Sequence, residues 1–298
     1  MINFKGGFKL KWMSYMEIFW KTLLIGLIVL FIMSCSTTAH FEDPQLHDLI
    51  SIEISLQSGN PPDNVTIQDL KDLTTLNLEG SIYSLDGIQR CSNLTTLRID
   101  SKMGILDLKP IAELDKLTRL SLKGMELKDL HPLESLVNLT NLSLVDSSIK
   151  DITSLESLTN LKHLDLSDNH IKDISSLRYL VNLRYLNLNN NMGEVGREWL
   201  ARMMPFDSIV DISPLSPLVE LETLNIGWTE VEDIGPLSSL SSITTLDLSY
   251  TNVRDIGPLE GLFNLINLDL TATRVKDYSL LDQLDIVDLK CTHDSRCR

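Results

Sequence analysis

The 298-residue chain has few basic residues, since 26 Lys and Arg stand against 41 Asp and Glu. Residues 1–34 hold four of the basic residues and one acidic residue, so the remainder carries 22 against 40, a net charge of −18. It lacks the clusters of Lys and Arg that phosphate binding needs, and this excludes a nucleic-acid partner. It also lacks blocks of consecutive acidic residues, so the negative charge lies on a folded surface and not in a tail.

No apolar run has the length of an ordinary membrane-spanning helix. The uncharged stretch from Leu23 to Met33 has eleven residues, whereas a spanning helix needs about 20. Lysines precede this stretch, and a basic segment followed by a short apolar core is typical of a signal peptide. We therefore predict a signal peptide over residues 1–34, with an uncleaved N-terminal anchor as the alternative. Both place the folded part outside the cytoplasm.

The residues that close this run, Ile32-Met33-Ser34-Cys35, resemble the lipobox of bacterial lipoproteins. In that family the cysteine thiol receives a diacylglycerol, the peptidase cuts before the cysteine, and the new N-terminus is acylated. The resemblance implies lipidation at Cys35 and a place in the bacterial envelope, on the outer membrane or on the outer face of the cytoplasmic membrane. Two or more acyl chains anchor a protein stably where one is marginal.

Internal repetition is the dominant signal beyond residue 70. The pattern L-x-x-L-x-L recurs, mostly every 22 residues, and its first residue is taken as position one of each repeat. The nine openings are Leu73, Leu94, Leu117, Leu139, Leu161, Leu183, Leu221, Ile243 and Leu265. The segment L-x-L predicts a short strand with inward leucines, and the D-I-x-P-L segment that follows leaves room only for a turn or a 3₁₀ helix. Stacked units bury a continuous apolar column that no single unit could bury.

These leucine-rich repeats resemble those of the bacterial internalin family, and the resemblance extends from Phe41 to about Leu289. We expect an α/β fold, a right-handed solenoid or horseshoe. It would have a curved parallel sheet on the concave face, short 3₁₀ and turn segments on the convex face, and a helical N-terminal cap. The expected divisions are a tether over 35–43, the cap over 44–72, repeats over 73–290 and a tail over 291–298.

An aspartate recurs at the same place in eight repeats. A column of carboxylates suggests calcium, but each Asp precedes the segment whose consensus is I-x-P-L, where an oxygen is needed to accept from free N–H groups at the start of a helical turn. We therefore predict capping and no metal site. The column consists of Asp107, Asp129, Asp151, Asp173, Asp211, Asp233, Asp255 and Asp277.

Two segments fall outside the repeat pattern. Asp43 followed by Pro44 predicts the start of a capping helix that presents Leu46, Leu49 and Ile50 on one face. The spacing from Leu183 to Leu221 exceeds the repeat by 16 residues, which places an insertion at residues 192–208. Its apolar residues, Trp199 and Phe206 among them, either fold onto the flank of the solenoid or form a protruding partner contact.

The four cysteines separate by position. Cys35 is the lipidation candidate, and Cys91 takes the place of a core leucine. Cys291 and Cys297 are a candidate disulfide in the C-terminal tail, outside the reducing cytosol. Metal ligation by these two with His293 would be an incomplete zinc set.

The outward residues of adjacent strands should line up across the concave sheet, at positions three, five, seven and eight of each repeat. Basic residues dominate the early strands and acidic ones the late strands, a pattern that could orient a partner. Trp228 and Tyr250 share position eight in neighbouring repeats, so their rings should be adjacent, either as an interface anchor or as simple mutual packing. The predicted partner-binding residues are Arg98, Arg119, Lys123, His163, Asp165, Tyr185, Trp228, Asp247, Tyr250 and Asp269.

Enzymatic activity is not expected. A hydrolytic triad can be drawn from His163, Asp165 and either Ser143 or Ser167. However, a shallow open sheet supplies neither a constrained nucleophile nor a donor pair for an oxyanion. The sequence lacks G-x-S-x-G, a phosphate loop and H-E-x-x-H, and no cofactor is implied.

The sequence therefore predicts a monomeric, membrane-anchored lipoprotein that binds a protein partner through its concave sheet. The internalin resemblance implies adhesion or binding of a host protein. The alternative is a structural or scaffolding protein of the cell envelope with periplasmic partners. The identity of the partner cannot be derived from the repeats, because the scaffold specifies a surface only.

Overall fold

A computed structural model describes residues 38–59, 64–101, 106–192 and 208–292. Several predicted features lie outside these residues: the signal peptide, Cys35, Cys297, and Trp199 and Phe206 of the insertion. Within the described residues, none of the helices combines the length and the apolar character that crossing a membrane would require.

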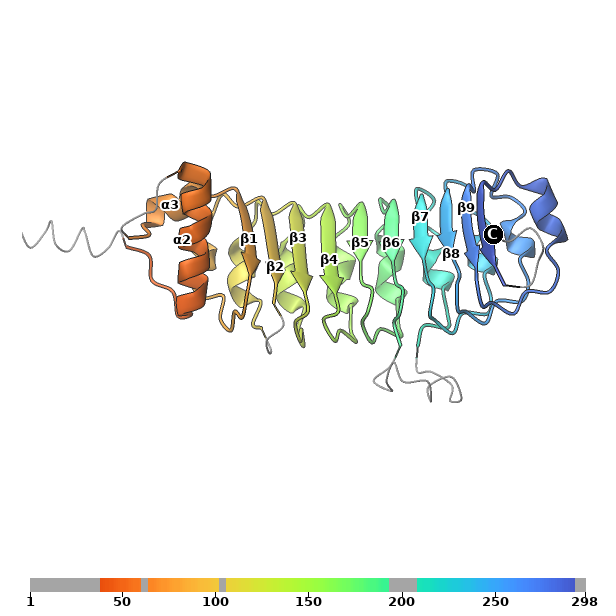
Figure 1. Cartoon of the computed structure of the whole chain (residues 1–298), viewed down its shortest axis with the longest axis horizontal. Helices are drawn as coiled ribbons and strands as arrows, with labels where there is room; N and C mark the ends of the chain where they lie inside the picture. The colour runs from red at the N-terminus through yellow and green to blue at the C-terminus, as the bar shows by residue number, and fades with distance from the viewer. Residues whose placement is uncertain (1–37, 60–63, 102–105, 193–207, 293–298) are drawn as a thin grey trace, which may run out of the picture.

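The strands form one open parallel sheet in which each strand pairs with the next along the chain (Figure 1). Inward leucines at positions four and six are in register from strand to strand, for example Leu142, Leu164 and Leu186. This architecture confirms the predicted leucine-rich repeat solenoid. The strands are β1 (Thr75–Glu79), β2 (Thr96–Asp100), β3 (Arg119–Lys123), β4 (Asn141–Val145), β5 (His163–Asp165), β6 (Tyr185–Asn187), β7 (Thr223–Asn225), β8 (Thr245–Asp247), β9 (Asn267–Leu270) and β10 (Asp288–Cys291).

The sheet has one more strand than the nine repeat openings predicted. The additional strand, β10, pairs with β9 and places Leu289 opposite Leu268 and Cys291 opposite Leu270. Cys291 therefore belongs to the last repeat, at the place of a core leucine, and its assignment to a tail was wrong. The sequence conceals this repeat because Ile286 and Cys291 stand where the pattern has its first and last leucine.

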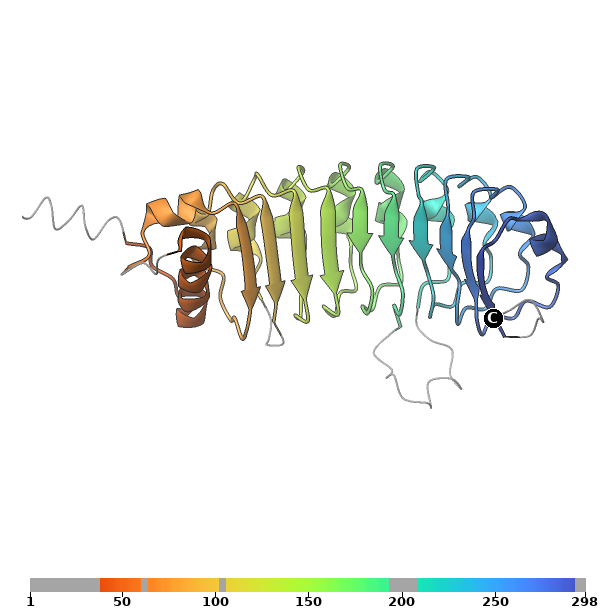
Figure 2. The ribbon, with the colours of Figure 1, turned by 45° about the horizontal axis from the view of Figure 1, so that its top comes forward.

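Short 3₁₀ helices return the chain on the other face of the solenoid (Figure 2). All eight column aspartates accept a hydrogen bond from the backbone amide two residues later, at 2.7 to 3.0 Å. In each case that amide belongs to the first residue of a 3₁₀ helix, so the capping prediction is confirmed. The helices are η1 (Ile88–Arg90), η2 (Lys109–Glu113), η3 (His131–Ser135), η4 (Thr153–Ser157), η5 (Ser175–Tyr179), η7 (Ser213–Leu215), η8 (Gly235–Leu237), η9 (Gly257–Leu259) and η10 (Ser279–Gln283).

Hydrogen bonds to two of these carboxylates also lower their pKa. The Thr153 hydroxyl and amide hold the pKa of Asp151 below its usual value. The Ser213 amide and hydroxyl do the same for Asp211. Both carboxyl groups are thus stabilised in the charged form, as a cap at the start of a helical turn requires.

Buried polar side chains form a second column at position nine, which the sequence analysis did not identify. Asn169 accepts from the amides of Ser147 and Ile149 at 3.0 and 3.1 Å, and its Nδ2 donates to three carbonyl oxygens. Asn191 repeats the arrangement one coil later. Beyond the insertion, threonines take this position, and each donates a single bond to the carbonyl three residues earlier. They are Thr229, Thr251 and Thr273.

Two helices cover the N-terminal edge of the sheet, α2 (Pro44–Ser58) and α3 (Ile67–Asp72). Leu46, Ile50 and Ile54 of α2 are buried, and α3 begins with a capping box between Thr66 and Asp69. Leu49, predicted on the same face as Leu46 and Ile50, is only partly buried and packs against the core from the side. The edge of β1, which would otherwise expose apolar side chains, is therefore covered.

Asp43 is a fully buried carboxylate that joins the cap to the first repeat. One oxygen caps α2 through the amides of Gln45 and Leu46. The other accepts from the amides of Tyr83 and Ser84, at 2.8 and 3.4 Å. The predicted helix start at Asp43 is confirmed, and the same side chain also fixes how the helix sits on the solenoid.

The segment predicted as a tether over 35–43 is not free from Thr38 onward. Thr38 forms an antiparallel bridge with Thr66, the amide of Ala39 donates to the carbonyl of Val65, and Ala39 and Phe41 are buried. The prediction of a nine-residue free tether was therefore wrong. Phe41 and Ala39 are apolar, and covering them against the cap removes them from water.

The insertion leaves the repeat register intact. Leu186 of β6 pairs with Leu224 of β7 as regularly as the leucines of any other strand pair. Its flanks are tied down, because the Ser208 hydroxyl donates to the carbonyl of Asn191 at 2.6 Å and the carbonyl of Met192 contacts Nδ1 of His170 at 2.8 Å. The described residues on the two sides of the insertion, Asn191 and Ser208, thus lie next to each other.

Candidate partner-binding surface

The concave sheet carries eight of the ten predicted partner-binding residues on its strands. Arg98, Arg119 and Lys123 of the early strands are exposed. The middle and late strands contribute partly buried residues: His163 and Asp165 of β5, Tyr185 of β6, Asp247 of β8 and Asp269 of β9.

The early and later strands differ in length, and a column of Asp and Asn at position five accounts for the difference. Strands β1 to β4 have five residues each, whereas β5 to β8 have three. In the later repeats the position-five side chain accepts a hydrogen bond from the amide two residues on, at 2.8 to 3.0 Å, and so bends the chain out of the strand. The residues are Asp165, Asn187, Asn225, Asp247 and Asp269.

This column gives the acidic residues of the concave face a structural role, while their contact with a partner stays a prediction. Asp165, Asp247 and Asp269 each use one carboxylate oxygen to hold a turn, and Asp165 also accepts from the Ser167 hydroxyl at 2.7 Å. Asp269 forms an ion pair with Lys290 at 3.7 Å. These residues therefore have structural roles in addition to any contact with a partner.

Trp228 and Tyr250 lie beside the sheet and not on its strands. Their rings stack with centroids 3.9 Å apart and an interplanar angle of 16°, so the predicted adjacency is confirmed. Both residues follow the short strands β7 and β8 by three positions, at the corner where the chain leaves the concave face. The placement of position eight on the sheet itself was wrong, because even the five-residue strands β1 to β4 end at position seven, and the position-five turns end β5 to β8 sooner still.

The backbone at this corner is in the left-handed region, with φ of 56° at Trp228 and 57° at Tyr250. The same position carries Asp146, Asp168 and Asn190 in the three preceding repeats, also with positive φ. Asp and Asn tolerate this conformation, whereas bulky side chains adopt it at a cost of order 1 kcal/mol or more. The backbone conformation therefore does not favour aromatic residues at this position, although stacking between the two rings offsets part of the conformational cost.

A small pocket of about 180 Å³ adjoins the aromatic pair. It opens between Trp228, Tyr250 and the flanks of the insertion, Met192 and Ser208. Ala272 takes position eight in the repeat after Tyr250, and Arg274 completes the wall.

His163 and Tyr185 form a second aromatic stack, on the strands themselves, with centroids 4.0 Å apart and planes within 4°. Partial burial lowers the pKa of His163, and nearby Asp165 opposes this effect. Burial, reinforced by Asp165 and opposed by a hydrogen bond with Asn187, raises the pKa of Tyr185. The net effect on His163 favours the neutral imidazole.

The hydrolytic triad considered from the sequence has no support in the hydrogen bonding of these residues. Asp165 is engaged by the amide and hydroxyl of Ser167, while the His163 ring lies against Tyr185. Asp165 and Ser143 face each other across β5 and β4, which places no base between an acid and a nucleophile in the way a triad requires.

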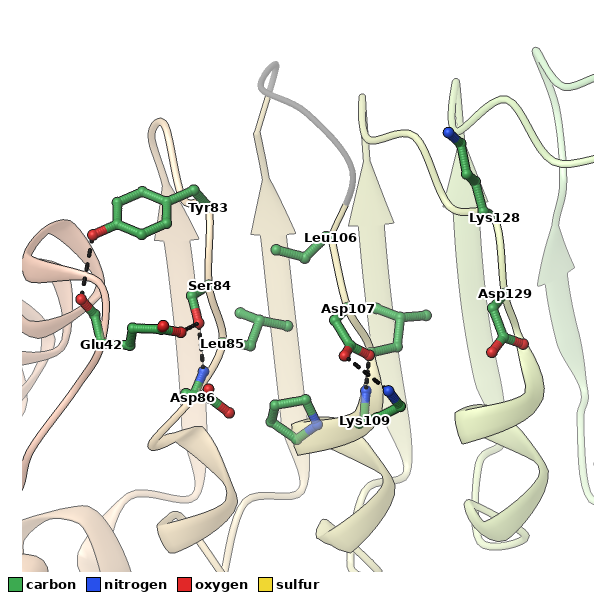
Figure 3. A pocket seen from close by; sticks show the side chains of 12 residues that line it. Glu42, Tyr83, Ser84, Leu85, Asp86, Leu106, Asp107, Lys109, Lys128 and Asp129 are labelled. Atoms are coloured by element: carbon green, nitrogen blue, oxygen red, sulfur yellow. Dashed lines mark hydrogen bonds and ion pairs between the residues drawn. The ribbon is translucent and has the colours of Figure 1, made fainter.

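A pocket of about 650 Å³ lies on the side of the first repeats and was not predicted (Figure 3). Leu85, Leu106 and Leu108 line it together with charged side chains of both signs. The Glu42 carboxylate accepts from the Ser84 hydroxyl, and Asp107 caps Lys109 and forms an ion pair with it at 3.4 Å. Among the described residues, no group of three or more His, Cys, Asp or Glu side chains could hold a metal ion.

The cysteines within the described residues differ in state. Cys91 is free and fully buried, as predicted for a core position, and burial raises the pKa of its thiol to about 12. Cys291 is disulfide-bonded. The partner of Cys291 is not among the described residues, so its pairing with Cys297 stays a prediction.

The comparisons with known proteins agree with this architecture. The family model of leucine-rich repeats in two copies matches residues 159–192. No match to the sequence is found among curated proteins. Among solved structures, internalin C2 from Listeria monocytogenes is similar, with 29% identity, a TM-score of 0.58, and coverage of 85% of this chain and 94% of that chain.

Two further solved structures show the likeness of fold alone. A leucine-rich repeat protein of Leptospira interrogans has 20% identity and a TM-score of 0.56, covering 76% of this chain and 63% of that one. The functional domain of InlJ from Listeria monocytogenes has 17% identity and a TM-score of 0.61, covering 88% and 63%. The chain thus contains a leucine-rich repeat domain whose solenoid is similar in structure to those of the internalins.

Proposed function

We propose that the protein is anchored in the bacterial envelope by lipid on Cys35 and binds a protein partner through its concave sheet and the corner beside it. The observation that carries the proposal is the stacked pair Trp228 and Tyr250. Large aromatic side chains with polar surroundings are enriched among the residues that dominate binding energy at protein interfaces. Leucine-rich repeat solenoids of this kind commonly serve as protein-interaction modules, which supports the same reading.

The aromatic pair is a sharper candidate than the charged residues of the sheet. The scaffold does not need aromatic rings at position eight, since Asp168 and Asn190 make the same corner in the two coils before Trp228. Tyr250 remains 37% exposed, and the adjoining pocket gives a partner side chain a place to enter. A rigid pair of rings next to a pocket loses little side-chain entropy on binding.

Replacing both aromatic residues with asparagine should abolish partner binding without loss of stability. Asparagine suits the left-handed corner, as Asn190 shows, so the melting temperature should stay within about 2 °C of the wild type. The measurement is capture of a partner from intact envelopes or host surface extracts, followed by titration of the captured protein against each variant. The matched control is Tyr179→Asn, an exposed tyrosine on the convex helix η5. Full binding by the double variant would move the site away from this corner.

The anchor is supported by the resemblance of Ile32-Met33-Ser34-Cys35 to a lipobox. The intact mass of the membrane-extracted wild type should begin at Cys35 and include acyl chains. Cys35→Ser should lose that mass increment and release the protein from the membrane, since acylation supplies the anchoring free energy. An unmodified full-length mass would contradict lipidation and favour an uncleaved anchor.

A further inference from the structure

The exposed face of α2 carries two apolar side chains that the solenoid does not cover. Ile52 is 56% exposed and Leu56 is 75% exposed. They lie one turn apart on the side of the helix turned away from the buried Leu46, Ile50 and Ile54. We refer to Ile52 and Leu56 as the apolar pair of α2.

The position of α2 at the N-terminal end of the solenoid gives this pair its significance (Figure 1). The chain is fixed to the cap from Thr38, through the bridge to Thr66 and the bond from Ala39 to Val65. Cys35 precedes Thr38 by three residues, which span roughly 10 Å at most when fully extended. That reach is about the diameter of one helix.

We infer that the apolar pair of α2 rests on the lipid surface and holds the solenoid in a fixed orientation to the membrane. The inference rests on the proposed lipid anchor at Cys35. A molecule anchored at Cys35 cannot move its cap farther from the bilayer interface than the three residues between Cys35 and Thr38 can extend. Two exposed apolar side chains of that cap are then transferred from water into the interface when the cap rests on it, which is favourable.

The residues around the apolar pair of α2 indicate which half of this helix contacts the lipid surface. Asp48 lies on the same exposed stripe, one turn before Ile52, and its carboxylate must stay in water. The exposed residues of α3 are polar, namely Gln68, Lys71 and Asp72. The C-terminal half of α2, from Ile52 onward, is therefore the contacting part. Because the cap carries several acidic residues, the surface it suits is a zwitterionic bilayer and not a strongly anionic one.

The test uses the full-length lipidated protein with Leu56→Cys, labelled with a nitrobenzoxadiazole fluorophore and inserted into phosphatidylcholine vesicles. Labelling is selective, because Cys91 is buried, Cys291 is disulfide-bonded with Cys297 as its predicted partner, and the Cys35 thiol carries lipid in the proposed protein. The matched control is Phe263→Cys, whose side chain is 74% exposed at the other end of the solenoid. Lipidation of each sample is verified first by intact mass.

We expect blue-shifted emission and quenching by nitroxide-bearing lipids for the label at residue 56, and neither effect for the label at residue 263. Adding Cys35→Ser should abolish both effects at residue 56. If the label at residue 56 shows the emission of a fluorophore in water, in a sample whose mass confirms lipidation, the inference is overturned and the proposed anchor is unaffected. An unmodified mass would overturn the anchor and the inference with it. A blue shift that persists in the unanchored variant would show that a second copy of the chain covers the pair instead.

Discussion

Truncation of Leu164 to alanine is expected to lower the free energy of unfolding by about 2 to 5 kcal/mol. Leu164 is fully buried in the centre of the solenoid and lies in register between Leu142 and Leu186. Its loss leaves a cavity that the neighbouring coils cannot close without shifting their own leucines. Since each coil contacts mainly its neighbours, the loss weakens both adjoining interfaces.

Thermal and urea unfolding followed by circular dichroism measure this effect. The control is Val181→Ala, a side chain 46% exposed on the edge of the solenoid, for which the change should be about 0.5 kcal/mol or less. An unaltered melting temperature for Leu164→Ala would show that the register of the central repeats differs from the one described.

Replacement of Asn169 with alanine is expected to cost about 3 kcal/mol, although the side chain is polar. Its amide group satisfies the backbone amides of Ser147 and Ile149 and contacts three carbonyl groups. Removing it leaves several buried backbone groups without a partner, and each such group costs about 1 to 3 kcal/mol before the coil relaxes.

Two further variants separate this role from the general effect of losing an asparagine. Asn169→Thr should cost less than Asn169→Ala, because threonine holds this position in the later repeats and bonds one carbonyl there. Asn182→Ala removes an exposed side chain with one bond to the carbonyl of Thr159, and should cost about 1 kcal/mol or less. Equal stability of the Asn169 and Asn182 alanine variants would contradict the proposed role of the buried column.

The leucine register and the capping aspartates could be predicted because both repeat with a fixed period and each follows from one physical rule. The turns formed by Asp165, Asn187 and Asp247 were equally periodic, yet they were interpreted as outward contacts. A side chain that bonds its own backbone depends on the local dihedral angles, which alternation of polar and apolar residues does not reveal. The early end of the later strands was missed for that reason.

The attachment of Thr38 to Thr66 also could not be predicted, but for a different reason. Its short sequence of small polar residues resembles a linker, and the bridge to Thr66 joins segments far apart in the chain. In the sequence, only the aromatic Phe41 indicates that the segment is attached, because an aromatic residue in a free tether would remain exposed to water. Long-range pairing of this kind has no local signature.

Because the strands keep a constant register and spacing, the number of repeats sets the distance between the cap and any later surface of the solenoid. Trp228 follows β7, which stands six strand spacings from β1, or roughly 30 Å at about 4.8 Å per strand. Gain or loss of one 22-residue unit between the cap and β7 would move the aromatic corner by a single spacing and alter neither end. Distance from the cap and chemistry of the corner can therefore be varied separately in evolution, the first by counting repeats and the second by changing side chains.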